Sequence, residues 1–159
     1  MLVKYDIDFQ DGLEGWISVR LVYSGCRRAL EGRACDGCHN EWLWEFKPGA
    51  CRRKFRDWLV ERREYGWTPS GIVITGGEPL DQDPEEVAFD INLVKEIFNP
   101  GIPRMPVLVY TGYEWSDSLK EHPIVRLAEY LKVGPYRKEI PPGRYASGNQ
   151  RLIRLVSLK

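Results

Sequence analysis

The stretch GIVITGGEP, residues 71–79, sets the fold class of this chain. It opens with a short β-branched run, Gly71 to Thr75, which is typical of a strand that is covered on both faces. Two glycines and a Glu-Pro pair follow at once and predict a tight turn at the end of that strand. A buried strand of this kind favours a parallel sheet, so we expect strands to alternate with helices on either side of it.

The flanking sequence shows this alternation. Strands are predicted at residues 18–23, 106–110, 131–133 and 151–156, and helices at residues 51–65, 84–98 and 122–130. Pro84 suits the first turn of its helix, and Asp83 is the expected N-cap. The order strand, helix, strand, helix, strand predicts a single α/β domain over residues 1–159 with a mainly parallel sheet.

Three unusual loops follow three of the predicted strands. The segment CRRALEGRACDGCHN, residues 26–40, follows the strand at 18–23, and Thr75 to Pro79 follow the next strand. Tyr110 to Tyr113 follow the third. Ligands of parallel sheets gather beyond the C-terminal ends of the strands, so we expect the three loops to lie at one edge and to line one site.

The bulk composition excludes several classes of protein. Lys plus Arg total 23 and Asp plus Glu total 23. This balance argues against a protein that binds nucleic acid mainly through the phosphate backbone. No apolar run approaches the roughly 20 residues that cross a bilayer. The N-terminal residues lack the apolar core of a signal peptide. We therefore expect a cytoplasmic protein that binds neither nucleic acid nor membrane and keeps its thiols reduced.

Three of the four cysteines stand within residues 26–40. In a reducing compartment, closely spaced cysteines are more often metal ligands than disulfides. A structural zinc takes four ligands, which all four cysteines together supply, with His39 as a spare. A 4Fe–4S cluster on Cys26, Cys35 and Cys38 instead leaves one iron open to bind a ligand. Cys51 is then expected to be a small, buried apolar residue.

These motifs in this order resemble the radical S-adenosylmethionine (SAM) enzymes. Three cysteines after a first strand and Thr-Gly-Gly-Glu-Pro after a second carry the resemblance. Within that superfamily the chain looks like the activating proteins of anaerobic ribonucleoside-triphosphate reductases. The motifs that narrow the match are Cys38-His39-Asn40, Tyr110 to Tyr113, Val133 to Tyr136 and Ser147 to Arg151. The resemblance spans residues 18–151.

The resemblance implies a partial, open (β/α) barrel of the radical SAM type with a 4Fe–4S cluster and SAM as cofactors. By this resemblance the metal ligands are Cys26, Cys35 and Cys38, and the residues against SAM are Gly37, Cys38, His39, Gly76, Gly77 and Glu78. Gly76 and Gly77 match the motif that receives the methionyl ammonium, where glycine allows backbone carbonyls to come close to the ligand. Glu78 is expected to strengthen that end, and its alternative role is to cap a turn or helix. The cofactors carry the chemistry, so no side chain is assigned as catalytic.

The implied activity is that of an activating enzyme. A flavodoxin-like donor reduces the cluster, SAM is cleaved to methionine and a 5′-deoxyadenosyl radical, and that radical takes a hydrogen atom from a backbone glycine of the reductase. A full eight-fold barrel takes about 250 residues. A chain of 159 residues therefore predicts an open flank, which suits a macromolecular substrate.

One departure from the family is the spacing of its first two cysteines. Eight residues, Arg27 to Ala34, separate Cys26 from Cys35, where the family has three. Such a loop still closes, because each doubling of loop length costs only about 0.6 kcal/mol. Two alternatives stay open: another short radical SAM enzyme, such as a 7-carboxy-7-deazaguanine synthase, and a zinc-stabilised binding module without catalysis.

Overall fold

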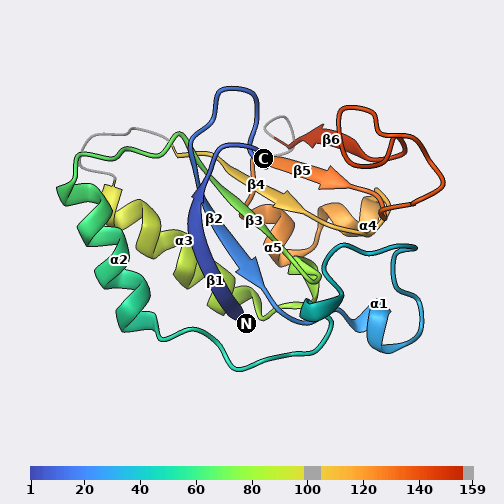
Figure 1. The fold of residues 1–159 in the computed structure, drawn as a ribbon, viewed down its shortest axis with the longest axis horizontal. Coiled ribbons are helices and arrows are strands. Elements are labelled where there is room, and N and C mark those ends of the chain that lie inside the picture. The colour runs from blue at the N-terminus through green and yellow to red at the C-terminus, as the bar shows by residue number, and fades with distance from the viewer. Residues whose placement is uncertain (99–104, 156–159) are drawn as a thin grey trace.

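The computed structural model describes residues 1–98 and 105–155, which fold around one six-stranded sheet (Figure 1). Its strands are β1 (Leu2–Asp8), β2 (Ser18–Tyr23), β3 (Gly71–Gly76), β4 (Val107–Tyr110), β5 (Tyr130–Val133) and β6 (Arg151–Arg154), and they lie in this order. Strands β2 to β5 are mutually parallel, and β1 and β6 join the two edges antiparallel. The predicted α/β fold with an open, mainly parallel sheet is confirmed.

Strand β3 occupies the middle of the sheet, as its composition predicts. Ile72, Val73 and Ile74 are fully buried. Side chains alternate between the two faces of a strand, so three buried neighbours mean that both faces are covered.

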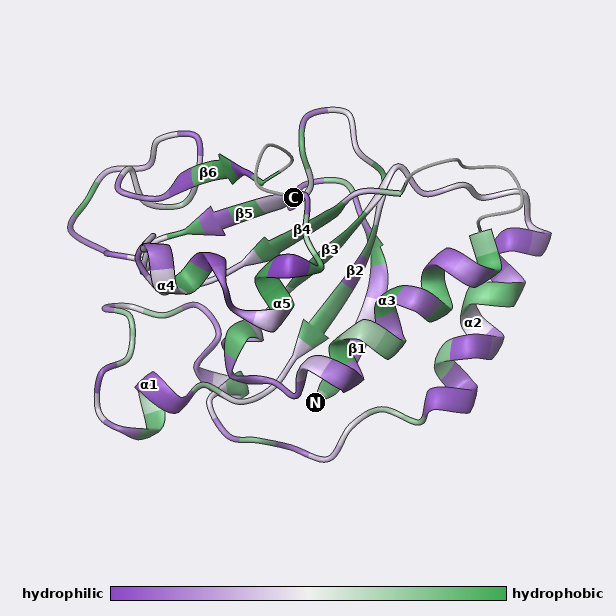
Figure 2. Cartoon of the chain, turned by 180° about the vertical axis from the view of Figure 1, so that it is seen from behind, coloured by the Kyte–Doolittle hydropathy of each residue, from purple (hydrophilic) through white to green (hydrophobic). Residues whose placement is uncertain are grey.

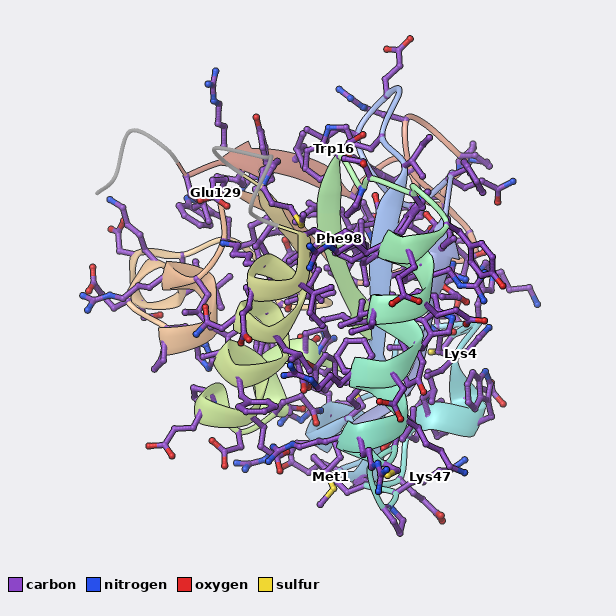
Figure 3. All side chains as sticks on the ribbon, turned by 90° about the vertical axis from the view of Figure 1, so that its left-hand side faces the viewer. Met1, Lys4, Trp16, Lys47, Phe98 and Glu129 are labelled. Carbon is purple, nitrogen blue, oxygen red and sulfur yellow. The ribbon has the colours of Figure 1, made fainter. Side chains whose placement is uncertain are left out.

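Helices cover one face of the sheet. Figure 2 shows α2 (Arg52–Glu64), α3 (Pro84–Phe98) and α5 (Pro123–Arg126) in front of the strands, and in Figure 1 the strands lie in front of them. Helix α3 places Val87, Ile91 and Val94 at helical spacing in the core. Figure 3 shows Phe98, at the end of this helix, in the layer between helices and sheet. In the part of the chain that the structure describes, no helix is long and apolar enough to cross a membrane.

Within the described residues, two further helices and two 3₁₀ turns lie in the loops. They are α1 (Arg27–Leu30), α4 (Asp117–Lys120), η1 (Glu41–Leu43) and η2 (Pro79–Asp81). The predicted cap of α3 is present, because the Asp83 carboxylate accepts a hydrogen bond of 2.9 Å from the Glu85 amide.

Three elements differ from the sequence prediction. Residues 2–8 form β1, which the sequence did not predict. The helix expected at residues 122–130 is a single turn, because the chain leaves it to pair with β4 through a 3.0 Å bond from the Glu129 amide to the Val107 carbonyl. The last strand ends at Arg154, and its predicted end at Val156 lies outside the described residues.

Candidate metal and cofactor site

The three unusual loops meet in one cavity of about 160 Å³ at the C-terminal ends of β2, β3 and β4. In Figure 1 these strands point to the side where α1 lies. Residues from all three loops line the cavity, including Cys26, Cys35, Cys38, Gly76, Glu78 and Thr111. The expectation that the loops share one edge and one site is confirmed. Gly134, Tyr136 and Gln150, from the C-terminal motifs, complete the wall.

Three of the four cysteines belong to this cavity. Cys26, Cys35 and Cys38 are each half-buried and line it. Burial raises the pKa of the Cys26 thiol. A turn joins the last two, with the Cys38 amide donating to the Cys35 carbonyl at 3.2 Å, and the positive φ of Gly37, +67°, suits that turn.

The expectation of a buried Cys51 is wrong. Its thiol is exposed at the N-cap of α2 and does not line the cavity. The backbone amides of Lys54 and Arg53, free donors of the first helical turn, lower the pKa of this thiol, although its side chain makes no capping hydrogen bond. Cys51 is therefore a surface thiol at the N-cap position rather than a core residue.

The long spacer between the first two cysteines is folded. Its first residues form α1, and the Arg27 amide donates a 2.6 Å hydrogen bond to the Asp81 carboxylate of η2. Arg28 donates to the Gly112 carbonyl and lies 5.5 Å from the centre of the Tyr113 ring. The spacer is thus tied to the other two loops and carries Arg28 into the cavity wall.

Gly76 and Gly77 are required by backbone packing. Gly76 has a φ of +124°, and a Cβ there would stand 2.2 Å from the Tyr23 carbonyl oxygen. A Cβ on Gly77 would stand 2.6 Å from the Gly25 carbonyl oxygen. The two glycines let the turn after β3 lie directly against the start of the cysteine loop. Both also line the cavity, and the side-chain amide of Asn40 donates a 3.0 Å hydrogen bond to the Gly76 carbonyl.

Glu78 joins two of the loops. Its side chain is 2% exposed and accepts hydrogen bonds from the Leu80 amide at 3.1 Å and the Thr111 hydroxyl at 2.8 Å. Its second oxygen accepts from the Gly112 amide at 2.8 Å. The first bond caps η2, which was the alternative role for this residue. Burial raises the pKa of the carboxyl to about 7.

The two residues that flank Cys38 are placed differently. His39 lines the cavity, with its ring centre 4.4 Å from that of Tyr136. Gly37 lies outside the cavity wall, where a Cβ would meet the Lys138 side chain at 3.2 Å. Contact of either residue with SAM stays a prediction.

The sequence assigned no role in the site to four residues that belong to it: Arg28, Asn40, Trp44 and Lys132. The Trp44 indole N–H and the backbone amide of Asn40 donate hydrogen bonds to the Cys38 sulfur at 3.5 and 3.4 Å. Lys132 is 8% exposed, and its ammonium lies 4.8 Å from the centre of the Tyr110 ring. Burial lowers the pKa of this ammonium to about 8. In a four-residue strand, β5, no periodicity marks Lys132 as an inward residue.

The thiols fit a 4Fe–4S cluster better than a single zinc ion. No three His, Cys, Asp or Glu side chains among the described residues gather closely enough to hold one metal ion. A multi-iron cluster needs less crowding, because its thiolates attach to different irons. Zinc needs a closed set of four ligands. Cys51 stands outside this cavity, and His39, which lines it, does not gather with the three thiols into a metal-binding group among the described residues.

Comparison with known proteins adds a family to this geometry. A family model described as "4Fe-4S single cluster domain" matches residues 14–153, which include all three cavity cysteines. Among solved structures, QueE from Escherichia coli is similar at a TM-score of 0.45 and 18% identity. The match covers 70% of this chain and 51% of that one, so this chain spans about half its length. No curated protein matches the chain.

Proposed function

The chain belongs to the 4Fe–4S single cluster domain family, and from this membership we propose that it is a radical SAM enzyme. Cys26, Cys35 and Cys38 hold the cluster, and SAM binds beside it in the same cavity. When bound, these cofactors supply one-electron cleavage of SAM to methionine and a 5′-deoxyadenosyl radical. The observation that carries the proposal is the meeting of three half-buried thiols with Gly76, Gly77 and Glu78 around one cavity.

The chain's own residues prepare this site. Trp44 and Asn40 orient the Cys38 sulfur and stabilise its negative charge. Glu78 holds the loops after β3 and β4 together and, once ionised, attracts the ammonium group of SAM. That attraction opposes the effect of burial and lowers the pKa of the carboxyl.

The substrate that the motifs support best is a glycine of an anaerobic ribonucleoside-triphosphate reductase, which makes this chain its activating enzyme. With both cofactors bound, their chemistry would remove one hydrogen atom from the glycine Cα and leave a glycyl radical on the reductase. A flavodoxin-like protein supplies the electron. Support comes from the C-terminal motifs, which pack together at the cavity: Gln150 donates a 3.1 Å hydrogen bond to the Gly134 carbonyl and Asn149 a 2.9 Å bond to that of Pro135.

A second candidate is a radical SAM enzyme that acts on a small molecule, such as a 7-carboxy-7-deazaguanine synthase. The observation that favours it is the pair of basic side chains, Arg28 and Lys132, in the cavity wall. A backbone glycine offers no charge for them to bind.

The first experiment is anaerobic reconstitution with iron and sulfide, followed by addition of SAM. We expect about four irons per chain, a changed electron paramagnetic resonance spectrum with SAM, and 5′-deoxyadenosine after reduction. The variant Cys35→Ala should lose iron, and Cys51→Ala serves as the matched control. Colourless protein with one zinc, or a spectrum that ignores SAM, contradicts the proposal.

The second experiment separates the two substrates. The loaded protein is mixed with a purified anaerobic reductase, and the sample is examined for the spectrum of a glycyl radical. A radical in the wild-type reductase that disappears when its acceptor glycine is replaced by alanine supports the activating role. Cleavage of SAM without any such radical refutes it and leaves the second candidate.

A further inference from the structure

One hydrogen bond in the cavity wall runs from a side chain to an expected cluster ligand. The Trp44 indole N–H donates to the Cys38 sulfur at 3.5 Å. The same sulfur accepts a second hydrogen bond, of 3.4 Å, from the backbone amide of Asn40. Each donor turns the positive end of its N–H dipole toward the sulfur, so the pair stabilises negative charge there. The bond from Trp44 is the one that a substitution can remove, because the other donor belongs to the backbone.

The backbone of Trp44 holds its indole in place. The Trp44 amide donates to the Glu41 carbonyl at 3.2 Å, which closes a turn that brings the chain back toward Cys38. The Trp44 carbonyl accepts a hydrogen bond of 2.9 Å from the Cys26 amide. Trp44 is therefore bonded to the first and the last of the three cavity cysteines. These contacts form within the chain itself, before any metal binds.

A second tryptophan in the same segment has different surroundings. Trp44 is half-buried and lines the cavity, where a low local dielectric strengthens a hydrogen bond to a charged sulfur. Trp42 is 55% exposed and does not line the cavity, and the Lys47 ammonium lies 5.5 Å from the centre of its ring. The chain thus offers a matched control, the same residue type two positions away on the surface.

We propose that Trp44 raises the reduction potential of the cluster through its indole N–H. The proposal rests on the proposed function, in which Cys38 holds the cluster. One electron passes from the flavodoxin-like donor to the cluster, and no bond to Trp44 forms or breaks. A hydrogen bond to the sulfur stabilises the reduced form more than the oxidised form, because the ligand sulfurs share the added negative charge. Since it acts through Cys38, Trp44 is a positioning residue rather than a catalytic one.

The test compares the midpoint potentials of clusters reconstituted anaerobically in wild type and in Trp44→Phe, without SAM. Each protein is titrated with dithionite in the presence of redox mediators, and the reduced cluster is followed by electron paramagnetic resonance. At a fixed potential the ratio of reduced to oxidised cluster should fall by about 3- to 10-fold in Trp44→Phe. For one electron, tenfold corresponds to a potential about 59 mV lower. Trp42→Phe, the matched control, should titrate like wild type.

A second variant separates the N–H group from the shape of the ring. Benzothienylalanine at position 44 keeps the two fused rings and has sulfur in place of the N–H. It should lower the potential as Trp44→Phe does and keep the iron content of wild type. A replacement that merely admits water to the cavity would raise the potential, because water stabilises the more negative, reduced form. The direction of the shift therefore distinguishes a lost hydrogen bond from a wetter cavity.

Four results contradict the proposal: a benzothienylalanine protein with the potential of wild type, a potential that rises in it, a loss of its iron, and an equal shift in Trp42→Phe. Failure of the proposed function looks different. A cluster that assembles but does not cleave SAM refutes the radical SAM activity, while its potentials still decide the role of Trp44. Wild-type protein that assembles no cluster overturns both proposals.

Discussion

Replacing Glu78 by glutamine should remove a large part of the pH dependence of this protein's stability. Burial raises the pKa of the Glu78 carboxyl from 4.5 to about 7 in the folded chain. In the unfolded chain the value returns to 4.5, so the folded state holds the proton more tightly. The stabilisation by Glu78 is therefore fully present below pH 4.5 and is lost as the pH rises through about 7.

The expected size of this loss follows from the two pKa values. One pKa unit corresponds to about 1.36 kcal/mol, so the rise from 4.5 to about 7 corresponds to about 3 kcal/mol of unfolding free energy. That is a large share of the 5–15 kcal/mol, roughly, that holds a typical domain folded. In the Glu78→Gln variant the new side-chain amide also turns a donor toward the Gly112 amide or toward Thr111, which costs about 1–3 kcal/mol at every pH.

The assay is urea unfolding of metal-free, reduced protein at a series of pH values from about 4 to about 8. The difference between wild type and Glu78→Gln isolates this carboxyl, because other groups such as Asp90 contribute equally to both curves. The control is Glu64→Gln, which removes an exposed carboxylate at the end of α2 and should follow wild type. Curves for wild type and Glu78→Gln that run parallel over the whole range would refute the reasoning.

Three further predictions concern the same loops. Cys51→Ala should keep the iron content of wild type, whereas Cys26→Ala should lose it, as iron analysis after reconstitution will show; the reverse pattern would move the ligand assignment to Cys51. Gly76→Ala should lower the unfolding free energy by about 2 kcal/mol or more, because its φ of +124° and the Tyr23 carbonyl leave no room for a Cβ; an unchanged urea midpoint contradicts this. The affinity for SAM should increase as the pH rises through about 7, because only ionised Glu78 attracts the ammonium, and calorimetry that finds no such increase argues against this contact.

The sequence was sufficient for strands β2 to β6 and for the position of the site. Buried β-branched residues identify β3 without ambiguity, and the general rule for parallel sheets brings the loops after β2, β3 and β4 to one edge. Each of these patterns lies within a short segment of the sequence, and the topology of a parallel sheet brings the segments together. They place Cys26, Cys35 and Cys38 in one cavity without any knowledge of side-chain contacts.

What the sequence did not reveal depends on tertiary contacts. The sequence of strand β1 mixes charged and apolar residues because β1 lies at the edge of the sheet. Its charges are explained only by the neighbouring strand, where Arg20 forms ion pairs with Asp6 at 2.9 Å and with Asp8 at 3.0 Å. The exposure of Cys51 follows from the start of α2, which places this residue at the N-cap position instead of burying it. The role of Glu78 as a link between loops needs Thr111, which is distant in sequence.

The same dependence explains the long spacer between the first two cysteines. A slack loop of that length would leave Cys35 free to move away from Cys26 and Cys38, and cluster assembly would then carry an ordering cost. The contacts of Arg27 with Asp81 and of Arg28 with Gly112 remove that freedom before any metal binds. Both anchor points lie on the loops that follow β3 and β4, so the spacer is fixed to the very segments that form the rest of the cavity. The extra residues therefore preserve the position of the thiols.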